Sequence, residues 1–443
     1  MGSLSGNEYD ILVIGGGIAG MEAATALGDM GFSVVLVEKE PSIGGLMISL
    51  SKVFPTTDCA SCISSPKVST VAHHQNIRLM TYSEVLDVRK ENGEFKAKVK
   101  QKARFVHPED CTGCLKCEQA CPVIVPHEFN QGFVGRKAAY VPFDTAYPRS
   151  AVIDLDNCIF CGACERVCPT NAIDFLQKDE EEELSVKTVL ITTGGKLFPM
   201  EKKKEFGYKK ISNVINGLQM ERLLAPTRPF NTVLRPSDGR IPGRIGYVLC
   251  AGSRDASLGN PYCSRICCMY SIKQAILLMG ALPLVDVTIH YMDIRAFGKG
   301  YEEFYRQAVE MGVQFVRGRV AELNELENGD VLLKSENTDT GQIVEEKYDM
   351  VVLAAGLLPE THNRKALGTL GYLTDSIGFI QPQADTIGET EVSEGVFAAG
   401  ISTGPKDIVD TIAEADAAAS SCASYMKENF SGKKAEKILR ELM

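Results

Sequence analysis

The sequence predicts an α/β protein with two doubly wound parallel-sheet domains, one of which is interrupted by a small cysteine-rich α+β insert. Two patterns of strand, glycine-containing turn and helix begin near residues 9 and 245, and such a pattern opens a doubly wound sheet. Between them, two runs of four closely spaced cysteines occupy 111–121 and 158–168. These three features divide the chain into two sheet domains and an insert.

Composition narrows the class of protein. The chain has 443 residues, enough for two or three domains, and a net charge of -10, which argues against nucleic acid as a partner. We find no apolar stretch of about 18 residues and no amino-terminal leader, so we expect a cytoplasmic protein without a membrane span. Fifteen cysteines in a reducing compartment favour metal binding over disulfides.

The first domain opens on a turn typical of phosphate binding. Residues 9–14 read YDILVI, a G-x-G-x-x-G turn and a helix-compatible segment follow, and a second apolar run ends at Glu38. In such a unit the first glycine makes the tight turn, the second lets the backbone approach a pyrophosphate, and the third lets the helix pack on the sheet. An acid at position 38 can accept from ribose hydroxyls. The residues that we assign to cofactor binding here are Gly15, Gly17, Ile18, Ala19, Gly20 and Glu38.

Further segments indicate that the dinucleotide is FAD. VLITTGG, VVLAAGLLPE and GVFAAGIST lie at 189–195, 351–360 and 395–403. With the glycine pair at 44–45, they resemble the two-domain flavoproteins of the thioredoxin-reductase and glutathione-reductase group, and the resemblance implies FAD. The usual acid after the last glycine is replaced by isoleucine at 401, a departure from that group. We assign to the same site Lys39, Gly44, Gly45, Gly195, Gly400, Ile401, Lys406, Asp407 and Ile408.

The insert, 104–178, carries the signature of a bacterial-type two-cluster ferredoxin. Both cysteine runs read C-x2-C-x2-C-x3-C-P, a pattern in which the fourth cysteine of each run ligates the other [4Fe–4S] cluster. A zinc site rarely needs two such runs. The first cysteine set is therefore Cys111, Cys114, Cys117 and Cys168, and the second cysteine set is Cys121, Cys158, Cys161 and Cys164. The acidic run 179–183 behind the insert is interpreted as a solvated turn.

A second dinucleotide-type domain is expected over 244–360. Its first strand, RIGYVLC, should lead into a second G-x-G-x-x-G that holds NAD(P)H, yet the turn reads C-A-G-S-R-D. The nicotinamide nucleotide motif is missing at that position. The FAD domain then comprises 8–103, 179–243 and 361–443, so that it is discontinuous in the sequence.

The sequence as a whole resembles the A subunit of heterodisulfide reductase, over residues 8 to 425. The motifs that carry the resemblance are FPTTDCASC, GNPYCSRICCMYSIKQA, YMDIRAFGKGYEEFY, GPKDIVDTIAEA and the insert. The family implies a further [4Fe–4S] cluster in the second domain. Its ligands match a third cysteine set, Cys250, Cys263, Cys267 and Cys268; four buried structural thiols are the alternative. The longest members carry further amino- and carboxy-terminal cluster domains, so this sequence is expected to be a short form.

Three remaining features stay open at this point. Cys59 and Cys62 could be a flavin-adjacent dithiol, half of a fourth cluster completed by another chain, or structural residues. Cys422 is expected in the core. Lys406 precedes a predicted helix whose amino terminus would stabilise negative charge on a reduced flavin. We expect Lys406 to contact the isoalloxazine ring and to act in catalysis, with a solvated lysine as the alternative.

The resemblance implies an oxidoreductase, a FAD- and iron–sulfur-containing electron-transfer subunit of an anaerobic heterodisulfide-reductase-like complex. Its flavin would permit electron bifurcation between a donor module, ferredoxin and a disulfide-reducing subunit. The implied partners are subunits like B and C of that enzyme, ferredoxin, and a hydrogenase- or formate-dehydrogenase-linked donor, with two copies of the present chain forming a homodimer. A non-bifurcating relay in a quinone-linked or sulfur-metabolism complex is the alternative. A stand-alone NAD(P)H oxidoreductase is a third interpretation, disfavoured by the missing glycine motif.

Overall fold

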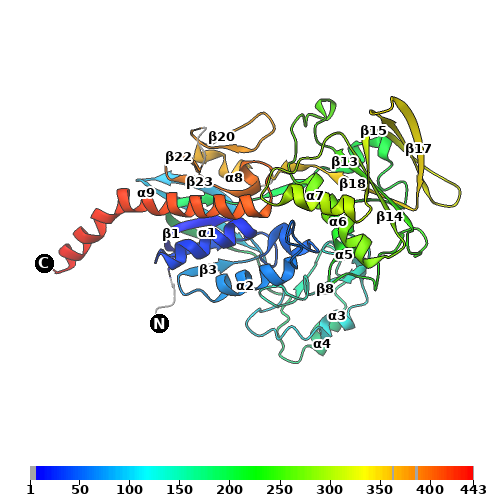
Figure 1. Ribbon diagram of the computed structural model, residues 1–443. Helices are drawn as coiled ribbons and strands as arrows, with labels where there is room; N and C mark the ends of the chain where they lie inside the picture. The colour runs from blue at the N-terminus through cyan, green and yellow to red at the C-terminus, as the bar shows by residue number, and fades with distance from the viewer. Residues whose placement is uncertain (1–5, 362–363, 385–387, 443) are drawn as a thin grey trace.

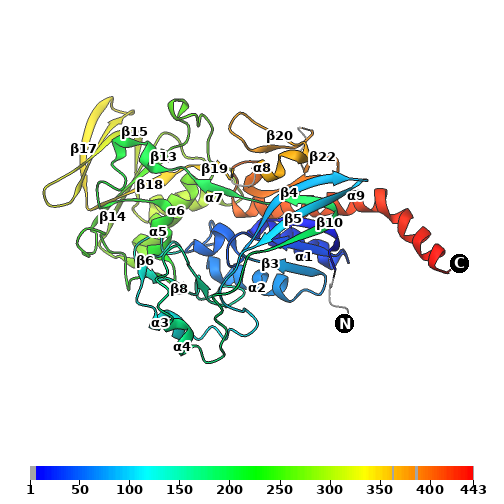
Figure 2. The same ribbon diagram turned by 180° about the vertical axis from the view of Figure 1, so that it is seen from behind.

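The computed structural model describes residues 6–361, 364–384 and 388–442, and it contains two large sheets with the insert beside them (Figures 1 and 2). The first sheet has the order β22-β23-β10-β1-β2-β3. Its central strands are parallel, and helices α1, α2 and α9 cover one face. The elements are β1 (Glu8–Ile14), α1 (Ile18–Asp29), β2 (Val34–Val37), α2 (Ala60–His73), β3 (Ile77–Met80), β10 (Glu180–Ile191), β22 (Glu391–Ser393), β23 (Val396–Ala398) and α9 (Ile408–Leu442).

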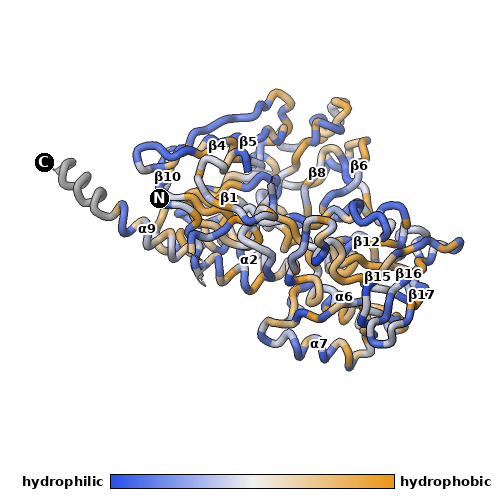
Figure 3. Tube along the Cα trace, turned by 90° about the horizontal axis from the view of Figure 1, so that it is seen from above, coloured by the Kyte–Doolittle hydropathy of each residue, from blue (hydrophilic) through white to orange (hydrophobic). Residues whose placement is uncertain are grey.

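The interpretation of 179–183 as a solvated turn is wrong, because its glutamates form the first part of β10. This part pairs antiparallel with β5 (Glu94–Gln101), which forms a hairpin with β4 (Ser83–Glu91). Lys98 Nζ lies 2.6 Å from Glu181, and Arg89 lies 2.9 Å from Glu183. Cross-strand pairs of opposite charge stabilise a strand that acidic residues alone would disfavour. Figure 3 shows hydrophilic residues along this part of β10.

The second sheet begins earlier in the sequence than predicted. Strand β12 (Val214–Asn216) pairs with β18 in this sheet, and Met220 and Leu223 lie in its core. The boundary that we placed between 243 and 244 therefore falls inside the second domain, because apolar side chains from about residue 198 onward pack on β13 and β18 rather than on the first sheet. Its other elements are α5 (Gly217–Leu224), β13 (Arg244–Ala251), α6 (Cys267–Ala281), β14 (Asp286–Tyr291), α7 (Tyr301–Glu310), β15 (Gln314–Glu325), β16 (Val331–Asn337), β17 (Gln342–Tyr348) and β18 (Met350–Ala355).

The chain crosses between the two sheets along a pair of short strands. Strand β11 (Gly195–Leu197) pairs antiparallel with β19 (Leu357–Pro359). Strand β11 follows β10 of the first sheet, and β19 follows β18 of the second sheet. The two segments that cross between the domains are therefore hydrogen-bonded to each other. The remaining elements are α8 (Arg364–Leu367), β20 (Leu373–Thr374) and β21 (Ile380–Gln381), with short 3-10 turns at Gly45–Ser49, Met200–Lys202, Lys204–Phe206, Ala256–Leu258, Gly368–Leu370 and Gly400–Thr403.

The insert is attached to both sheet domains. Arg104 Nη2 donates to the Pro41 carbonyl and to Thr81 Oγ1, both at 2.6 Å, on the first-domain side. Arg222 of α5 donates to Asn130 Oδ1 at 3.1 Å on the second-domain side. These contacts hold the insert in one place beside the junction. Its elements are α3 (Lys116–Ala120), β6 (Ile124–Pro126), β7 (Gly135–Lys137), β8 (Ala139–Tyr140), β9 (Val152–Ile153) and α4 (Ala163–Val167).

Helix α9 packs along α1 through an apolar face of small residues. Cys422 is fully buried there, within the cluster that includes Ala418 and Ala419, as expected for a core thiol. Burial raises the pKa of the Cys422 thiol, so it stays protonated at neutral pH. Within the described residues, no helix combines the length and apolar character needed to cross a bilayer.

The substitution Cys422→Ser tests this structural role. We expect it to lower the free energy of unfolding by about 1–3 kcal/mol, because it places a hydroxyl without an assured partner in an apolar core. Urea unfolding followed by circular dichroism measures the change. Cys422→Ala is the matched control and should cost less, and iron content should be unchanged in both. Loss of iron would contradict a purely structural role.

Candidate functional site

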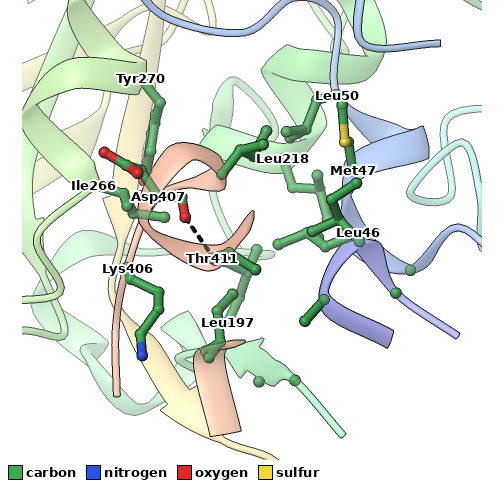
Figure 4. A pocket seen from close by; sticks show the side chains of 18 of the residues that line it. Leu46, Met47, Leu50, Leu197, Leu218, Ile266, Tyr270, Lys406, Asp407 and Thr411 are labelled. Carbon is green, nitrogen blue, oxygen red and sulfur yellow. Dashed lines mark hydrogen bonds between the residues drawn. The ribbon is translucent and has the colours of Figure 1, made fainter. Parts of the chain in front are cut away.

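A deep cavity lies where the two sheet domains meet, and it collects most of the residues that the sequence assigned to FAD (Figure 4). The first domain contributes the glycine turn and the loop after β2. The second domain contributes residues of α5 and α6. The predicted residues that line it are Gly15, Gly17, Ile18, Ala19, Glu38, Lys39, Gly45, Gly195, Ile401, Lys406, Asp407 and Ile408. Gly20, Gly44 and Gly400 are not among the residues that line it.

The glycine turn has the close contacts that its motif demands. A Cβ on Gly15, whose φ is 111°, would stand 2.4 Å from the Thr192 carbonyl oxygen. A Cβ on Gly20 would stand 1.9 Å from the Gly15 oxygen, so the third glycine permits the helix to pack against the turn. Helix α1 begins directly after Gly17 and directs free backbone N–H groups toward the cavity, where an anionic phosphate is favoured.

Glu38 holds the turn in place from the end of β2. Its Oε2 accepts from the Gly16 N–H at 2.6 Å, and its Oε1 accepts from the Glu40 N–H at 2.9 Å. The side chain is buried, and burial raises the pKa of this carboxyl against the effect of both N–H donors. Each oxygen keeps a lone pair, so the predicted ribose contact fits the geometry in addition to this backbone role.

The side chain of Lys406 is buried where the segment before α9 lines the cavity. The alternative of a solvated lysine is therefore wrong. Its side chain is 9% exposed, and Nζ donates to Glu414 Oε2 at 2.5 Å and to Thr403 Oγ1 at 2.6 Å. Burial lowers the pKa of Lys406, and Glu414 opposes that shift. The helix begins after Lys406, because Asp407 Oδ1 caps it by accepting from the Asp410 N–H at 2.9 Å. Glu414 also accepts from the Gly400 N–H at 2.6 Å.

A buried ion pair on the second-domain side of the cavity was missed in the sequence. Lys273 of α6 and Glu221 of α5 are 1% and 3% exposed, with Nζ 2.5 Å from Oε1. Glu221 Oε1 also accepts from Gln274 at 2.5 Å, and Oε2 accepts from the Ser51 N–H and hydroxyl at 2.8 and 2.6 Å. The only sequence signal is a Lys-Gln pair inside the otherwise apolar segment MYSIKQAILLMG.

The insert brings each ferredoxin-type cysteine set around a small cavity of its own. One cavity is lined by all four members of the first cysteine set, and another by all four members of the second. Each set combines three cysteines of one run with the last cysteine of the other, as the motif predicts. Among the described residues, no three Cys, His, Asp or Glu side chains converge tightly enough for a single metal ion. A cube needs its ligands farther apart than one ion does.

The third cysteine set converges at the turn after β13. Cys267 and Cys268 are the first two residues of α6, and both are buried. Burial raises the pKa of both thiols, and the nearby Cys250 and Cys263 raise it further. Ile266, within the same segment, lines the flavin cavity together with Tyr270 of α6. Tyr270 OH and Cys267 Sγ approach the same Ala355 carbonyl, at 3.2 and 3.7 Å, so the set and the cavity are separated by a thin wall of side chains.

Cys59 and Cys62 lie apart from all three sets, at the start of α2. Cys59 is the N-cap residue, and its Sγ accepts from the Cys62 N–H at 3.4 Å. Burial raises the pKa of the Cys59 thiol, but the hydrogen bonds from Cys62 and Ser61 together with the charge of Lys52 outweigh it and lower that pKa, and Cys62 is exposed. Their role stays open among the three alternatives.

Comparison with protein families agrees with this layout. A model described as FAD dependent oxidoreductase matches residues 10–112, a 4Fe-4S dicluster domain matches 110–173, and Pyridine nucleotide-disulphide oxidoreductase matches 153–420. The last model covers more than half of the chain. This chain belongs to the pyridine nucleotide-disulphide oxidoreductase family. The predicted fold class, FAD and [4Fe–4S] clusters are thereby confirmed, and this family member is an oxidoreductase.

The predicted resemblance to the A subunit of heterodisulfide reductase is also confirmed. The A subunit of the H(2):CoB-CoM heterodisulfide,ferredoxin reductase of Methanothermobacter thermautotrophicus is 44% identical over 94% of this chain. That of the H(2)/formate:CoB-CoM heterodisulfide,ferredoxin reductase of Methanococcus maripaludis is 44% identical over 95%. That of the ferredoxin/F(420)H(2)-dependent CoB-CoM heterodisulfide reductase of Methanosarcina acetivorans is 42% identical over 93%. The chain spans 63%, 65% and 52% of these relatives.

Solved structures share the fold of this family member. Thioredoxin reductase of Lactococcus lactis superposes with a TM-score of 0.53 at 15% identity, over 95% of this chain and 99% of the other. Thioredoxin reductase of T. acidophilum gives 0.52 at 16% identity, with the same coverage.

Removing one partner of the buried Lys273–Glu221 ion pair tests how much the pair contributes to the stability of the fold. We expect Lys273→Met to lower the free energy of unfolding by about 3–5 kcal/mol, since Glu221 is left as an unpaired buried charge. The double variant Lys273→Met/Glu221→Gln should recover most of this loss. Urea unfolding measures both, and the exposed Lys98→Met is a control expected to cost about 0–1 kcal/mol. Equal losses in the single and double variants would show that the pair does not act as a unit.

Proposed function

We propose that this chain is an electron-transfer component of a heterodisulfide-reductase-like complex, in which FAD in the central cavity exchanges electron pairs for the single electrons of three [4Fe–4S] clusters. FAD supplies two-electron chemistry with access to one-electron steps. The residues of this chain bind it, exclude water from the cavity and fix the third cluster beside it. The observation that carries the proposal is the shared wall between the third cysteine set and the flavin cavity.

The turn after β13 supports the transfer of single electrons rather than of hydride from NAD(P)H. In a nucleotide-binding domain that turn is glycine-rich and open to a pyrophosphate. Here the Phe198 ring packs on it, since a Cβ on Gly252 would meet Phe198 Cδ1 at 2.2 Å. Cys250, the penultimate residue of β13, has a φ of 57°, a conformation that residues other than glycine rarely adopt. A ring thus closes the turn and a thiol stands at the end of the strand before it, which favours a cluster over NAD(P)H.

The names of the relatives suggest the reaction and the partners of the whole complex. Their names refer to heterodisulfide, ferredoxin, H(2) and formate, so we propose a cytoplasmic complex with a disulfide-reducing subunit, ferredoxin and a hydrogenase- or formate-linked donor, in which two copies of this chain form a homodimer. Bifurcation at the flavin is the finer proposal. A spectroelectrochemical titration of the flavin tests it. Crossed potentials, in which the second one-electron reduction of the flavin is easier than the first, would support bifurcation. Well-separated potentials in the normal order would contradict it and support a simple electron relay.

The third cluster is tested by Cys267→Ala. We expect the iron content to fall from about twelve to about eight atoms per chain, because one cube loses a ligand, with FAD content unchanged. Electron transfer from reduced flavin to an external one-electron acceptor should slow in parallel. Cys422→Ala is the control and should leave iron unchanged. Unaltered iron and transfer in Cys267→Ala would defeat the proposal, and more than about twelve irons in the wild-type chain would point to a fourth cluster at Cys59 and Cys62.

Lys406 is proposed to tune the flavin by its charge. Lys406→Met should lower the two-electron potential of the bound flavin by roughly 30 mV or more, because a cation that favours the reduced flavin is lost and Glu414 stays negative. Glu414→Gln should shift the potential in the opposite direction. Potentiometric titration measures both, and Lys427→Met, an exposed position on the same helix, is the control. Potentials equal to wild type in both charge variants would contradict the role.

A further inference from the structure

Two cysteines lie outside the three cysteine sets and outside the core. Cys59 caps the amino terminus of α2, and Cys62 lies in the first turn, where its N–H donates to Cys59 Sγ at 3.4 Å. Cys62 is exposed and Cys59 is partly exposed, and Figure 1 shows α2 on the outer side of the first domain. Molecules in solution can therefore reach both thiols, whereas Cys422 is fully buried.

Neither a metal site nor a packing role accounts for the pair within this chain. Among the residues that the structure describes, no third Cys, His, Asp or Glu side chain completes a site for a single metal ion with them. Every other cysteine belongs to a set or to the core, so a cube here would need ligands from a second protein. A thiol that serves packing alone is buried, which Cys62 is not. The spacing Cys-x-x-Cys at a helix amino terminus is that of thiol–disulfide oxidoreductases.

The two thiols differ in acidity, as an exchange reaction requires. Burial raises the pKa of the Cys59 thiol, but the hydrogen bonds from Cys62 and Ser61 and the charge of Lys52 outweigh it and lower that pKa. The hydrogen bond with Cys59 raises the pKa of the Cys62 thiol. The thiolate is the form that attacks a disulfide. Cys59 is therefore the nucleophile, and Cys62 is the thiol that resolves a mixed disulfide.

The loop before α2 connects the pair to the flavin cavity. An antiparallel bridge joins Cys59 to Lys52, and the Val53 N–H donates to the Asp58 carbonyl at 2.9 Å, so the loop between them is closed at its base. Lys52, Val53 and Phe54 line the cavity. The charge of Lys52 therefore acts on the Cys59 thiol, while the same residue forms part of the cavity wall.

We propose that Cys59 and Cys62 form a thiol–disulfide exchange site for low-molecular-weight disulfides, and that its oxidation acts on the flavin cavity through Lys52. The Cys59 thiolate attacks one sulfur of the small disulfide, the S–S bond breaks, and one thiolate leaves. Cys62 then loses its proton to water and attacks the Cys59 sulfur, which forms the disulfide of the pair and releases the second thiolate. The pair loses two electrons and two protons, and the small disulfide gains them as two thiols.

The segment around the pair favours a small disulfide over a protein disulfide. Among the described residues, none of the large exposed apolar side chains lies between residues 31 and 85. Protein partners dock on contiguous exposed apolar side chains, whereas a small disulfide needs only an accessible thiolate. The neighbouring Thr56 and Asp58 are exposed and polar. The surface beside the thiols therefore matches a reaction with a small molecule.

Oxidation of the pair removes negative charge from beside Lys52. In the dithiol form the Cys59 thiolate partly neutralises the Lys52 ammonium group, and in the disulfide form this charge is absent. The cavity wall then carries more uncompensated positive charge, which favours a reduced anionic flavin. By linkage, the redox state of the flavin acts equally on the pair. This coupling rests on the proposed flavin site, whereas exchange at the pair does not.

Differential alkylation of the full chain, with FAD and clusters in place, tests the exchange reaction. The protein is incubated anaerobically with hydroxyethyl disulfide, and peptide mass spectrometry follows Cys59 and Cys62. We expect a disulfide between them in the wild type. Cys62→Ser should stop at the mixed disulfide on Cys59, and Cys59→Ser should react about tenfold more slowly, because the thiol of lower pKa is lost. Cys422 should stay unmodified in all three proteins.

Matched controls separate the exchange site from general thiol reactivity. Lys67→Met removes an ammonium group farther along the same helix, where it pairs with Glu22, and should leave the exchange rate unaltered, whereas Lys52→Met should lower it. Oxidised thioredoxin should react no faster than hydroxyethyl disulfide at the same concentration. Absence of the disulfide in the wild type, a faster reaction with thioredoxin, or iron that is lost in Cys59→Ser would each overturn the exchange site.

Two variants of the first cysteine test the effect on the flavin. Ser and Asp both serve as helix caps in place of Cys59, but only Asp keeps a negative charge there. The bound flavin should be reduced at a lower potential in Cys59→Asp than in Cys59→Ser, with the reduction equilibrium shifted about threefold. Potentiometric titration measures this, and Lys52→Met in both backgrounds should abolish the difference.

The outcomes distinguish the coupling from the proposed function. Equal flavin potentials in Cys59→Asp and Cys59→Ser would overturn the action of the pair on the cavity. A wild-type chain that binds no flavin would defeat the proposed function, and the exchange reaction at Cys59 and Cys62 would still be measurable.

Discussion

One buried carboxylate is hydrogen-bonded to both sheet domains. Glu221 accepts two hydrogen bonds from Ser51 in the first domain and one each from Lys273 and Gln274 in α6. Its negative charge is balanced by a single ammonium group, which also donates to the Lys52 carbonyl at 2.7 Å. Because a buried charge without these partners would be strongly unfavourable, the loop 51–52 and helices α5 and α6 are held in one relative position. The flavin cavity lies among these segments, so its shape depends on this interaction.

Helix α6 transmits that constraint to the third cysteine set. Its first residues, Cys267 and Cys268, belong to the set, and Tyr270, Lys273 and Gln274 one turn later line the flavin cavity. One helix therefore carries residues of both the third cysteine set and the flavin cavity, so the Glu221 contacts also fix the position of the set relative to the cavity. A second tie acts from α9, where Asp407 accepts from Tyr301 OH at 2.5 Å. Electron exchange between fixed centres requires no domain movement, in contrast to a reaction in which a nucleotide must enter and leave.

The fold and the two ferredoxin cysteine sets could be predicted because local motifs encode them. Features that depend on contacts between segments far apart in the sequence could not be predicted. The glycine turn and the C-x2-C-x2-C-x3-C-P runs encode their geometry within short spacings, and the structure gathers those residues. The domain boundary was misplaced because strand Val214–Asn216 has only three residues, too few for an alternating pattern to predict a strand. The glutamates of β10 resemble a turn in the sequence because their stabilising lysines and arginines lie about 80–90 residues earlier. Glu221 and Lys273 were missed for the same reason.

The third cysteine set uses an electrostatic feature that the fold already provides. In a nucleotide-binding domain the first helix after the turn directs its amino terminus at a pyrophosphate, whose negative charge it stabilises. Here α6 begins at Cys267, so thiols occupy the place of the phosphates. Burial, with a further contribution from Cys250, Cys263 and Asp293, raises the pKa of Cys268 to about 12, and a set of buried thiols without metal would stay protonated. In the proposed cluster, iron would take the place of those protons, since metal ligation requires the thiolate form. The helix terminus would favour that anionic cluster as it would favour a phosphate, so on this proposal an anion site is retained while the chemistry changes from hydride to single electrons.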